Sequence, residues 1–358
     1  MRARWFVAVL TAAAVLAGGC GNNAGDKPAG SDAPTIALFL PESKTTRYEA
    51  FDRPLFEAKV KALCAACKVL YANADQDAAK QQQQVEAALA QGADVLVLDA
   101  VDAGAVASLV NQAKQKKVPV VAYDRLISGI TYEYYVSFDN VRVGEMQGQA
   151  LLDALNKTGK AGSGQIVMIN GSPTDPSSAD YKKGAHKILD GKVQIGREYD
   201  TPDWSPDKAQ QEMEQAITAL GRDNVVGVLS ANDGMAGGAI AAMKRAGYTT
   251  LPPITGQDAE LAAVQRILTG EQYMTIYLDI RQEAEKSAEL AVALGRGEKP
   301  AAPTKVNNGT GDIPTFLLDP TAVTADKIKD TIIKDGFYKA SEVCTGAVAA
   351  ACAKVGIQ

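Results

Sequence analysis

The sequence predicts an α/β protein of two domains, each built on a parallel β-sheet. Short apolar segments alternate with amphipathic segments in units of roughly 25–30 residues, which is the pattern of strands joined by crossover helices. The alternation pauses midway and restarts at Gly162-Ser163-Gly164. The chain has 358 residues, more than one ordinary core accommodates, so two domains are expected.

The first half of the chain supplies one run of strands and helices. Val118, Val120 and Val121 indicate a strand buried on both faces, and Gly92 follows a predicted helix where a left-handed residue commonly ends one. The predicted strands are Thr35–Leu40, Val69–Ala72, Val95–Leu98, Val118–Tyr123 and the extended segment Tyr134–Asp139. The predicted helices are Thr46–Ala66, Ala78–Gln91, Ala103–Lys116 and Val141–Asn156.

The second half repeats the alternation. The predicted strands are Gln165–Asn170, Val193–Tyr199, Val225–Ser230, Ile254–Gly256, Gln272–Tyr277 and Thr315–Leu318. The predicted helices are Ala179–Leu189, Pro206–Leu220, Met235–Ala246, Glu260–Thr269, Arg281–Leu294 and Ala325–Asp335. Residues 300–311 are predicted to be a loop, and spacing alone assigns the chain after Tyr277 to neither domain.

The composition argues against several classes of function. A net charge of −5 gives no basic footprint for nucleic acid, so no nucleic-acid partner is expected. His186 is the single histidine, which makes histidine metal sites and catalytic triads unfavourable. The sequence contains no GxSxG, P-loop, HExxH or strand-associated GxGxxG motif. We therefore expect no enzyme activity, no cofactor and no metal, with paired acids for glycoside hydrolysis as the remaining enzymatic alternative.

The first twenty residues are predicted to be an export signal. A basic start is followed by an apolar stretch too short for a stable transmembrane helix. Ala17-Gly18-Gly19 before Cys20 resembles the bacterial lipoprotein signal, in which the cysteine becomes the lipidated N-terminus; ordinary signal cleavage is the alternative. Residues 21–34 are predicted to be a flexible tether. We thus expect an exported chain held at the outer face of the cytoplasmic membrane by a lipid anchor on Cys20.

The four remaining cysteines fall into two close pairs. Export makes disulfides the default, and the spacings favour bridges Cys64–Cys67 and Cys344–Cys352, although three pairings are possible. A redox CxxC would begin a helix after a strand, whereas this one ends a helix. A four-cysteine zinc site is disfavoured by the long spacing in the second pair.

Polar side chains follow nearly every predicted strand. Carboxylates, amides and guanidiniums of this kind bind the paired hydroxyls of a sugar, and an indole packs on its C–H face. Each could also be structural, because Asp or Asn after a strand commonly caps a helix. The residues at strand ends are Lys44, Arg47, Asp124, Arg125, Asp139, Asn140, Asp175, Ser177, Trp204, Asn232, Asp233, Gln257 and Asp258.

Several motifs resemble those of the ribose/galactose-type periplasmic sugar-binding family, and specifically its D-xylose-binding branch. They are VVAYDRLI, YYVSFDNVRVGEMQG, NGSPTD, SANDGMAGGAI, TGQDAELAAVQRI, MTIY and DTIIKDGFYK. The resemblance implies two Rossmann-like three-layer domains joined by three hinge crossings. One domain would combine residues 33–138 with 276–312, and the other 139–275 with 313–358.

The resemblance also implies a function and a ligand set. The chain would capture a monosaccharide, foremost D-xylose, by hinge closure and deliver it to the transmembrane subunits of an ABC permease, acting as a monomer. The alternatives are a sensor that presents sugar to a membrane receptor, or another aldose such as glucose, arabinose or ribose. The implied ligand contacts are Lys44, Arg47, Asp124, Arg125, Asp139, Trp204, Asn232 and Asp258. Pro176, Ser177 and Leu278 depart from the pattern of the xylose branch.

Overall fold

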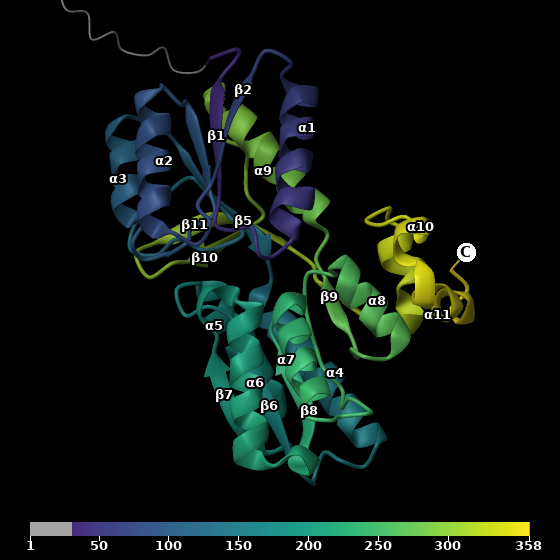
Figure 1. Ribbon diagram of the computed structural model, residues 1–358. Coiled ribbons are helices and arrows are strands. Elements are labelled where there is room, and N and C mark those ends of the chain that lie inside the picture. The colour runs from purple at the N-terminus through teal and green to yellow at the C-terminus, as the bar shows by residue number, and fades with distance from the viewer. Residues whose placement is uncertain (1–30, 358) are drawn as a thin grey trace, which may run out of the picture.

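The first lobe is built on a seven-stranded sheet (Figure 1). The computed structural model describes residues 31–357. The strand order is β10-β11-β5-β4-β3-β1-β2, and only the pair β10/β11 is antiparallel. The strands are β1 (Thr35–Leu40), β2 (Lys68–Asn73), β3 (Val95–Leu98), β4 (Val120–Tyr123), β5 (Tyr134–Phe138), β10 (Thr304–Asn307) and β11 (Asp312–Leu318).

Helices cover both faces of this sheet, which buries β1, β3, β4 and β5 almost completely. One face packs against α1 (Arg53–Leu63) and α9 (Ile280–Gly295), and the other against α2 (Ala78–Ala90) and α3 (Ala107–Gln115). The result is the predicted three-layer arrangement.

The second lobe has a smaller parallel sheet in the order β7-β6-β8. Its strands are β6 (Gln165–Asn170), β7 (Ile195–Asp200) and β8 (Val225–Ser230). A bridge between Val228 and Ile254 extends it, and the antiparallel pair β9 (Thr275–Tyr277) and β12 (Thr321–Val323) lies beyond. On one face lie α4 (Asn140–Lys157) and α5 (Pro176–Leu189), and on the other α6 (Pro206–Leu220) and α7 (Asp233–Arg245).

The chain ends beside α8 (Leu261–Thr269), where a short helical unit extends the second lobe sideways (Figure 1). It contains α10 (Ala340–Val343) and α11 (Ala349–Lys354). Gln265 of α8 donates to the carbonyl of Val343 at 3.1 Å. Disulfides join Cys344 to Cys352 in this unit and Cys64 to Cys67 after α1, which confirms both predicted pairs.

The chain crosses between the lobes after β5, after β9 and after β11. Strand pairing corrects two of the predicted boundaries. Ile276 and Tyr277 pair with β12 in the second lobe, and residues 313–318 pair with β5 in the first. The sequence shows where a strand ends, but its spacing does not show which of two sheets that strand joins.

Other differences concern polar or distorted segments. The predicted loop 300–311 contains β10, an exposed edge strand without apolar alternation. Ile254–Gly256 forms only one bridge, and the predicted helix Ala325–Asp335 is a 3₁₀ turn followed by a π-helical turn at Lys329–Ile333. Cys20 and most of the predicted tether lie outside the described residues. No helix within residues 31–357 combines the length and apolar character needed to cross a membrane.

Two glycines let α4 and α5 approach each other closely. A Cβ on Gly144 would lie 1.9 Å from the carbonyl oxygen of Tyr181, and one on Gly184 would lie 2.0 Å from that of Val141. Neither backbone oxygen can move without shifting its helix. The glycines therefore fix where α5 begins, which matters because that end faces the other lobe.

We expect Gly144→Ala to lower the free energy of unfolding by about 3 kcal/mol, because the added methyl overpacks the α4–α5 contact. Urea denaturation measures the change. Gly162→Ala is the matched control, since a Cβ there meets nothing within 4 Å, and it should change stability by less than about 0.5 kcal/mol. Equal stability of the two variants would contradict this account of the packing.

Candidate functional site: a polar cavity between the lobes

A cavity of about 290 Å³ lies between the two lobes, at the small end of the range for ligand pockets. Its lining is almost entirely polar or aromatic and comes from both lobes. The lining residues are Thr45, Arg47, Tyr48, Asp124, Arg125, Asp175, Tyr181, Trp204, Asn232, Gln257 and Asp258. Six of the eight predicted ligand contacts are among them, from segments more than 200 residues apart in the chain.

Arg47 enters the cavity from the loop after β1, just before the π-helical turn Tyr48–Asp52. Such turns are rare and are frequent at functional sites. The guanidinium of Arg47 is held by Asp52 at 2.7 Å and by Glu283 of α9 at 2.6 Å, and its third nitrogen lies 3.6 Å from Asp124. With the side chain only 4% exposed, these carboxylates fix the guanidinium in one orientation.

Asp124 and Arg125 follow β4 directly, at the carboxyl edge of the sheet where ligands of open α/β folds bind. Asp124 has a left-handed backbone (φ 60°), and its carbonyl accepts hydrogen bonds from Ser137 and Tyr135 at 2.7 and 3.1 Å. These bonds hold the turn, and the hydroxyl of Tyr48 donates to the Asp124 carboxylate at 3.0 Å. The turn separates the two side chains, so Asp124 faces Arg47 while Arg125 extends toward the second lobe.

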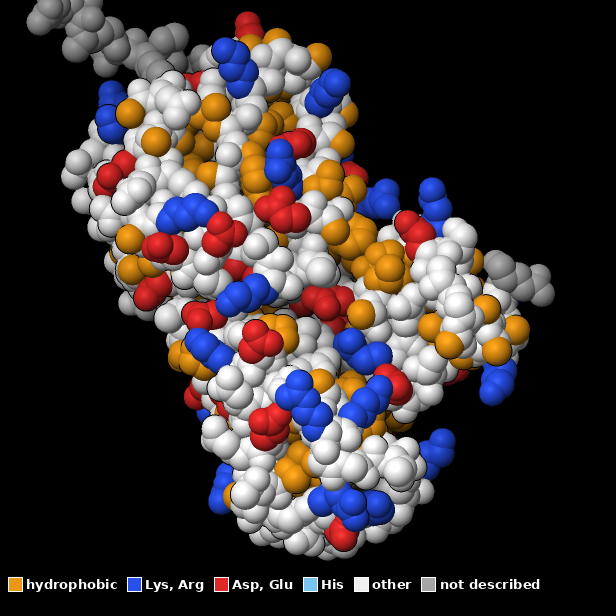
Figure 2. All heavy atoms as spheres, in the orientation of Figure 1, with side chains coloured by type: hydrophobic (Ala, Val, Ile, Leu, Met, Phe, Trp, Pro, Cys, Tyr) orange, Lys and Arg blue, Asp and Glu red, His pale blue; other side chains and the backbone are white. Residues whose placement is uncertain are grey.

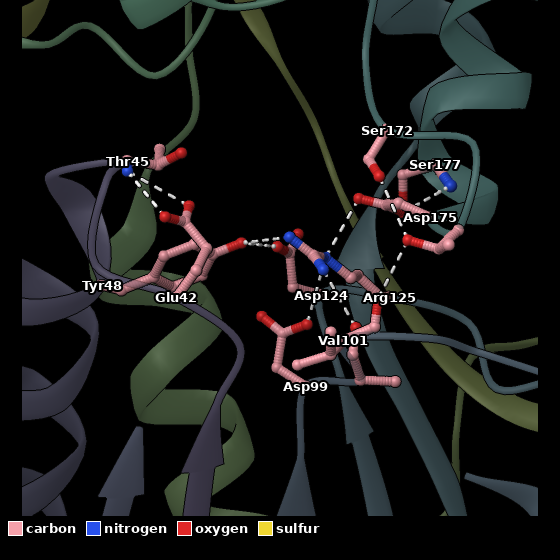
Figure 3. Close-up of polar contacts among 12 residues, drawn as sticks. Glu42, Thr45, Tyr48, Asp99, Val101, Asp124, Arg125, Ser172, Asp175 and Ser177 are labelled. Atoms are coloured by element: carbon pink, nitrogen blue, oxygen red, sulfur yellow. Dashed lines mark hydrogen bonds and ion pairs between the residues drawn. The ribbon is translucent and has the colours of Figure 1, made fainter. Parts of the chain in front are cut away.

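Arg125 lies among three carboxylates, as Figure 3 shows. Its Nε is 3.0 Å from Asp175 of the second lobe and 3.4 Å from Asp99, and Nη1 donates to the carbonyl of Ala100 at 3.0 Å. Asp99 is fully buried, and burial raises the pKa of its carboxyl while Arg125 opposes that rise. The arrangement explains why sequence reasoning could not separate an ion pair from a ligand contact: Arg125 is positioned for both.

Trp204 ends a 3₁₀ turn after β7 and has a left-handed backbone, as does Asp203 before it. Its indole covers Gly171, where a Cβ would meet the ring at 2.0 Å, and contacts the ring of Tyr181 edge-on at 6.3 Å. The indole N–H donates to Asp175 at 3.2 Å. The ring is thereby fixed at the cavity wall, where a backbone strained at two successive residues is typical of a functional position.

Asn232 and Asp258 come from the ends of neighbouring segments of the second sheet. The side-chain oxygen of Asn232 caps α7 by accepting from the Met235 N–H at 2.9 Å, so its amide group remains for the cavity. Asp258 has a left-handed backbone (φ 90°), and its N–H donates to Ile276 at 2.9 Å. Burial raises the pKa of Asp258 to about 7, against the opposing effect of Arg47.

Lys44 and Asp139 are not among the lining residues. Lys44 is exposed, and Asp139 accepts from the Arg142 N–H at 3.1 Å as the cap of α4. Their positions therefore differ from the predicted ligand set. Leu278, where the related pattern has a basic residue, is buried in the core of the second lobe. Ser177 is also buried, and its hydroxyl accepts from Asn140 at 3.2 Å.

Five lining residues were absent from the predicted ligand set. Asp175 and Gln257 follow strand ends, the same signal that identified the others, and that signal applied more strictly would have included them. Tyr48 and Tyr181 lie on helical segments, where an aromatic residue reads as core, and both are indeed 4–5% exposed. Thr45 carries no distinguishing pattern.

The charges of the cavity favour an uncharged ligand. Three aspartates and two arginines line it, and both guanidiniums are already paired with carboxylates of the protein. Burial raises the pKa of Asp175, with Arg125 opposing. An anion would meet carboxylates without a free cation to balance it, whereas hydroxyl groups can donate to those carboxylates and accept from the guanidiniums. The described part of the chain holds no grouping of His, Cys, Asp or Glu suited to a metal ion.

The raised pKa of Asp258 predicts a pH dependence. Its carboxyl stays protonated to about pH 7 in the folded protein but ionises near 3.8 once exposed, so its contribution to stability is lost as pH rises from about 4 to 7. Asp258→Asn removes this loss. In thermal melts of the ligand-free proteins, the melting temperature of the variant minus that of the wild type should increase from pH 4 to 7 and level off above. A difference independent of pH would contradict the assignment.

Two α/β lobes enclosing a small polar cavity define a protein that binds a solute between its lobes. The chain belongs to the periplasmic binding protein domain family, whose model matches residues 36–299. It is 37% identical over 313 residues to the D-xylose-binding periplasmic protein of Escherichia coli K12, covering 86% of this chain and 92% of that one. It is 38% identical to the protein of the same name from Haemophilus influenzae, covering 85% and 90%.

Solved structures agree with the fold. An ABC transporter solute-binding protein from Clostridium phytofermentans with bound β-D-glucose superposes with a TM-score of 0.79 at 28% identity, covering 86% of this chain and 99% of that one. The predicted fold class, two lobes of the periplasmic-binding type joined by hinge crossings, is confirmed.

Proposed function

We propose that this chain is an extracytoplasmic receptor that encloses one neutral monosaccharide, foremost D-xylose, and delivers it to an ABC-type permease. The observation that carries the proposal is the composition of the cavity: planar polar groups from both lobes surround one indole. Carboxylates, amides and guanidiniums each satisfy two neighbouring hydroxyls, which is the recognition that a pyranose requires. The indole of Trp204 supplies a flat apolar surface for the C–H face of the ring.

The division of these groups between the lobes supports capture by closure. Arg47, Asp124 and Arg125 belong to the first lobe, whereas Trp204, Asn232 and Asp258 belong to the second. A ligand that contacts both sets favours the arrangement in which the lobes are together. Hydrogen bonds to charged groups contribute about 1.5–3 kcal/mol each, so several of them, offset by the costs of ordering, yield micromolar or tighter affinity.

The sugar class follows from the relatives and the charge balance together. Two relatives at 37–38% identity are named for D-xylose, and a structural relative holds β-D-glucose. The paired guanidiniums disfavour sugars that carry a carboxylate or phosphate. We therefore expect aldopyranoses to bind, with D-xylose as the tightest ligand.

Isothermal titration with D-xylose, D-glucose, L-arabinose and D-ribose tests the proposal. D-Glucose and D-glucuronate form a matched pair, because they differ only in whether carbon 6 carries a hydroxyl or a carboxylate, and only glucose should bind. Binding of no pentose or hexose would overturn the proposal. Tighter binding of glucuronate than of glucose would overturn the argument from charge.

The same proposal includes a lipid anchor on Cys20, supported by the small residues before it in the sequence. Mass spectrometry of the mature N-terminus from the native membrane should find a diacylglyceryl group on Cys20. Cys20→Ala should release the protein from the membrane fraction. An unmodified terminus at another residue would remove the anchor from the account without affecting sugar binding.

A further inference from the structure

Asp175 connects the two lobes inside the cavity. It precedes α5 of the second lobe, and its Oδ1 accepts from the Ser177 N–H at 2.8 Å as the helix cap. Its Oδ2 accepts from the indole of Trp204 at 3.2 Å and lies 3.0 Å from Nε of Arg125 in the first lobe. The carboxylate is 5% exposed. One oxygen thus belongs to the second lobe, and the other is shared between the lobes.

Each half of this connection is held by its own lobe. Arg125 keeps its contacts with the Ala100 carbonyl and Asp99 whether or not the lobes are together, since both partners lie in the first lobe. Asp175 likewise keeps its cap and its bond to Trp204. The Arg125–Asp175 ion pair is therefore the bond gained on closure, formed between preorganised groups in a buried site where charge-assisted contacts are strong.

The residue before Asp175 extends the contact toward the rim. The hydroxyl of Thr174 donates to the carbonyl of Val101 at 3.2 Å, and the Ala103 N–H donates to the carbonyl of Thr174 at 3.3 Å. Both partners belong to the first lobe, and Thr174 does not line the cavity. Figure 3 shows Asp175 and Arg125 meeting above Asp99 and Val101. All of these bonds join protein to protein, so none of them needs a ligand.

We propose that Asp175, supported by Thr174, is a closure-positioning residue: it joins Arg125 to Trp204 across the cleft and stabilises the closed arrangement without the ligand. The ligand-free protein then populates the closed arrangement, and the measured affinity contains that population, because only the closed form completes the cavity. The statement about affinity rests on the proposed sugar-binding function, whereas the statement about closure does not.

Small-angle X-ray scattering of the ligand-free proteins tests the closure directly. The wild-type curve should require a closed component, and Asp175→Asn should shift the radius of gyration toward the open form, because the amide keeps an acceptor for the cap but loses the charge. Thr174→Val, which removes only a rim hydroxyl, should shift it in the same direction by less. Asp77→Asn is the matched control: Asp77 caps α2 of the first lobe through the Lys80 N–H at 2.9 Å, and Asn caps equally well.

Titration with D-xylose supplies the second readout. Asp175→Asn should weaken binding roughly 30-fold or more, Thr174→Val about fivefold, and Asp77→Asn not measurably. Superposable ligand-free scattering of wild type and Asp175→Asn would overturn the inference, even if affinity fell, since Asp175 would then be a ligand contact only. Failure of wild type to bind any sugar would overturn the proposed function instead, and the scattering result would still decide the inference.

Discussion

Arg125→Ala is expected to abolish sugar binding. Arg125 is 2% exposed and contacts Asp99, Asp175 and the Ala100 carbonyl, so its removal leaves two buried carboxylates without their cation. Losing one partner of a buried, hydrogen-bonded charge pair costs about 2–5 kcal/mol or more. A micromolar affinity corresponds to about 8 kcal/mol, so a loss of about 4 kcal/mol moves the dissociation constant to the millimolar range.

Isothermal titration with D-xylose measures this effect, and circular dichroism establishes that the variant is folded. Arg53→Ala is the matched control, because Arg53 lies on α1 of the same lobe, is about 42% exposed and pairs only with Glu49 and Glu57. Its affinity should equal that of the wild type. Arg125→Lys should bind weakly, since an ammonium keeps the charge but not the planar fork. Unchanged affinity in Arg125→Ala would remove the guanidinium from the site.

Trp204→Ala is expected to weaken sugar binding at least tenfold, which corresponds to about 1.4 kcal/mol. The substitution removes the only indole of the cavity lining and with it the flat surface against which a sugar ring packs. It also removes the N–H that Asp175 accepts and exposes the space over Gly171. Part of the loss therefore comes through Asp175 and part through the ring itself.

Trp204→Phe separates these contributions, because phenylalanine keeps an aromatic face but has no N–H. Its affinity should lie between those of the wild type and the alanine variant. Wild-type affinity in Trp204→Ala would place the sugar away from the indole. An affinity of Trp204→Phe as low as that of Trp204→Ala would mean that the bond to Asp175, rather than stacking, carries the effect.

The regular elements were predictable because their signals are local. β1, β3, β6, β8 and α6 lie within the predicted bounds, since their apolar runs and caps are encoded within each segment. Both disulfides were likewise predictable from short spacings. β10 was missed because an edge strand needs no apolar alternation, and the lobe to which β11 belongs is decided by pairing with β5, a contact between distant segments.

The candidate site was predictable to the extent that strand ends converge. Asp124, Arg125, Asn232 and Asp258 were identified because each follows a strand. Asp139 follows a strand as well, but its carboxylate caps α4, and the sequence could not distinguish capping from ligand binding. Tyr48 was not predictable, because its place in the cavity depends on the π-helical turn and on Asp124 of another segment.

The crystal structure of the protein grown with saturating D-xylose tests the central claim most directly. The account predicts one sugar in the cavity between the lobes, with its ring against the indole of Trp204. Its hydroxyls should lie within hydrogen-bond distance of Asp124 and Arg125 from the first lobe and of Asn232 and Asp258 from the second. A cavity without sugar under these conditions, or a sugar bound elsewhere on the molecule, would contradict it.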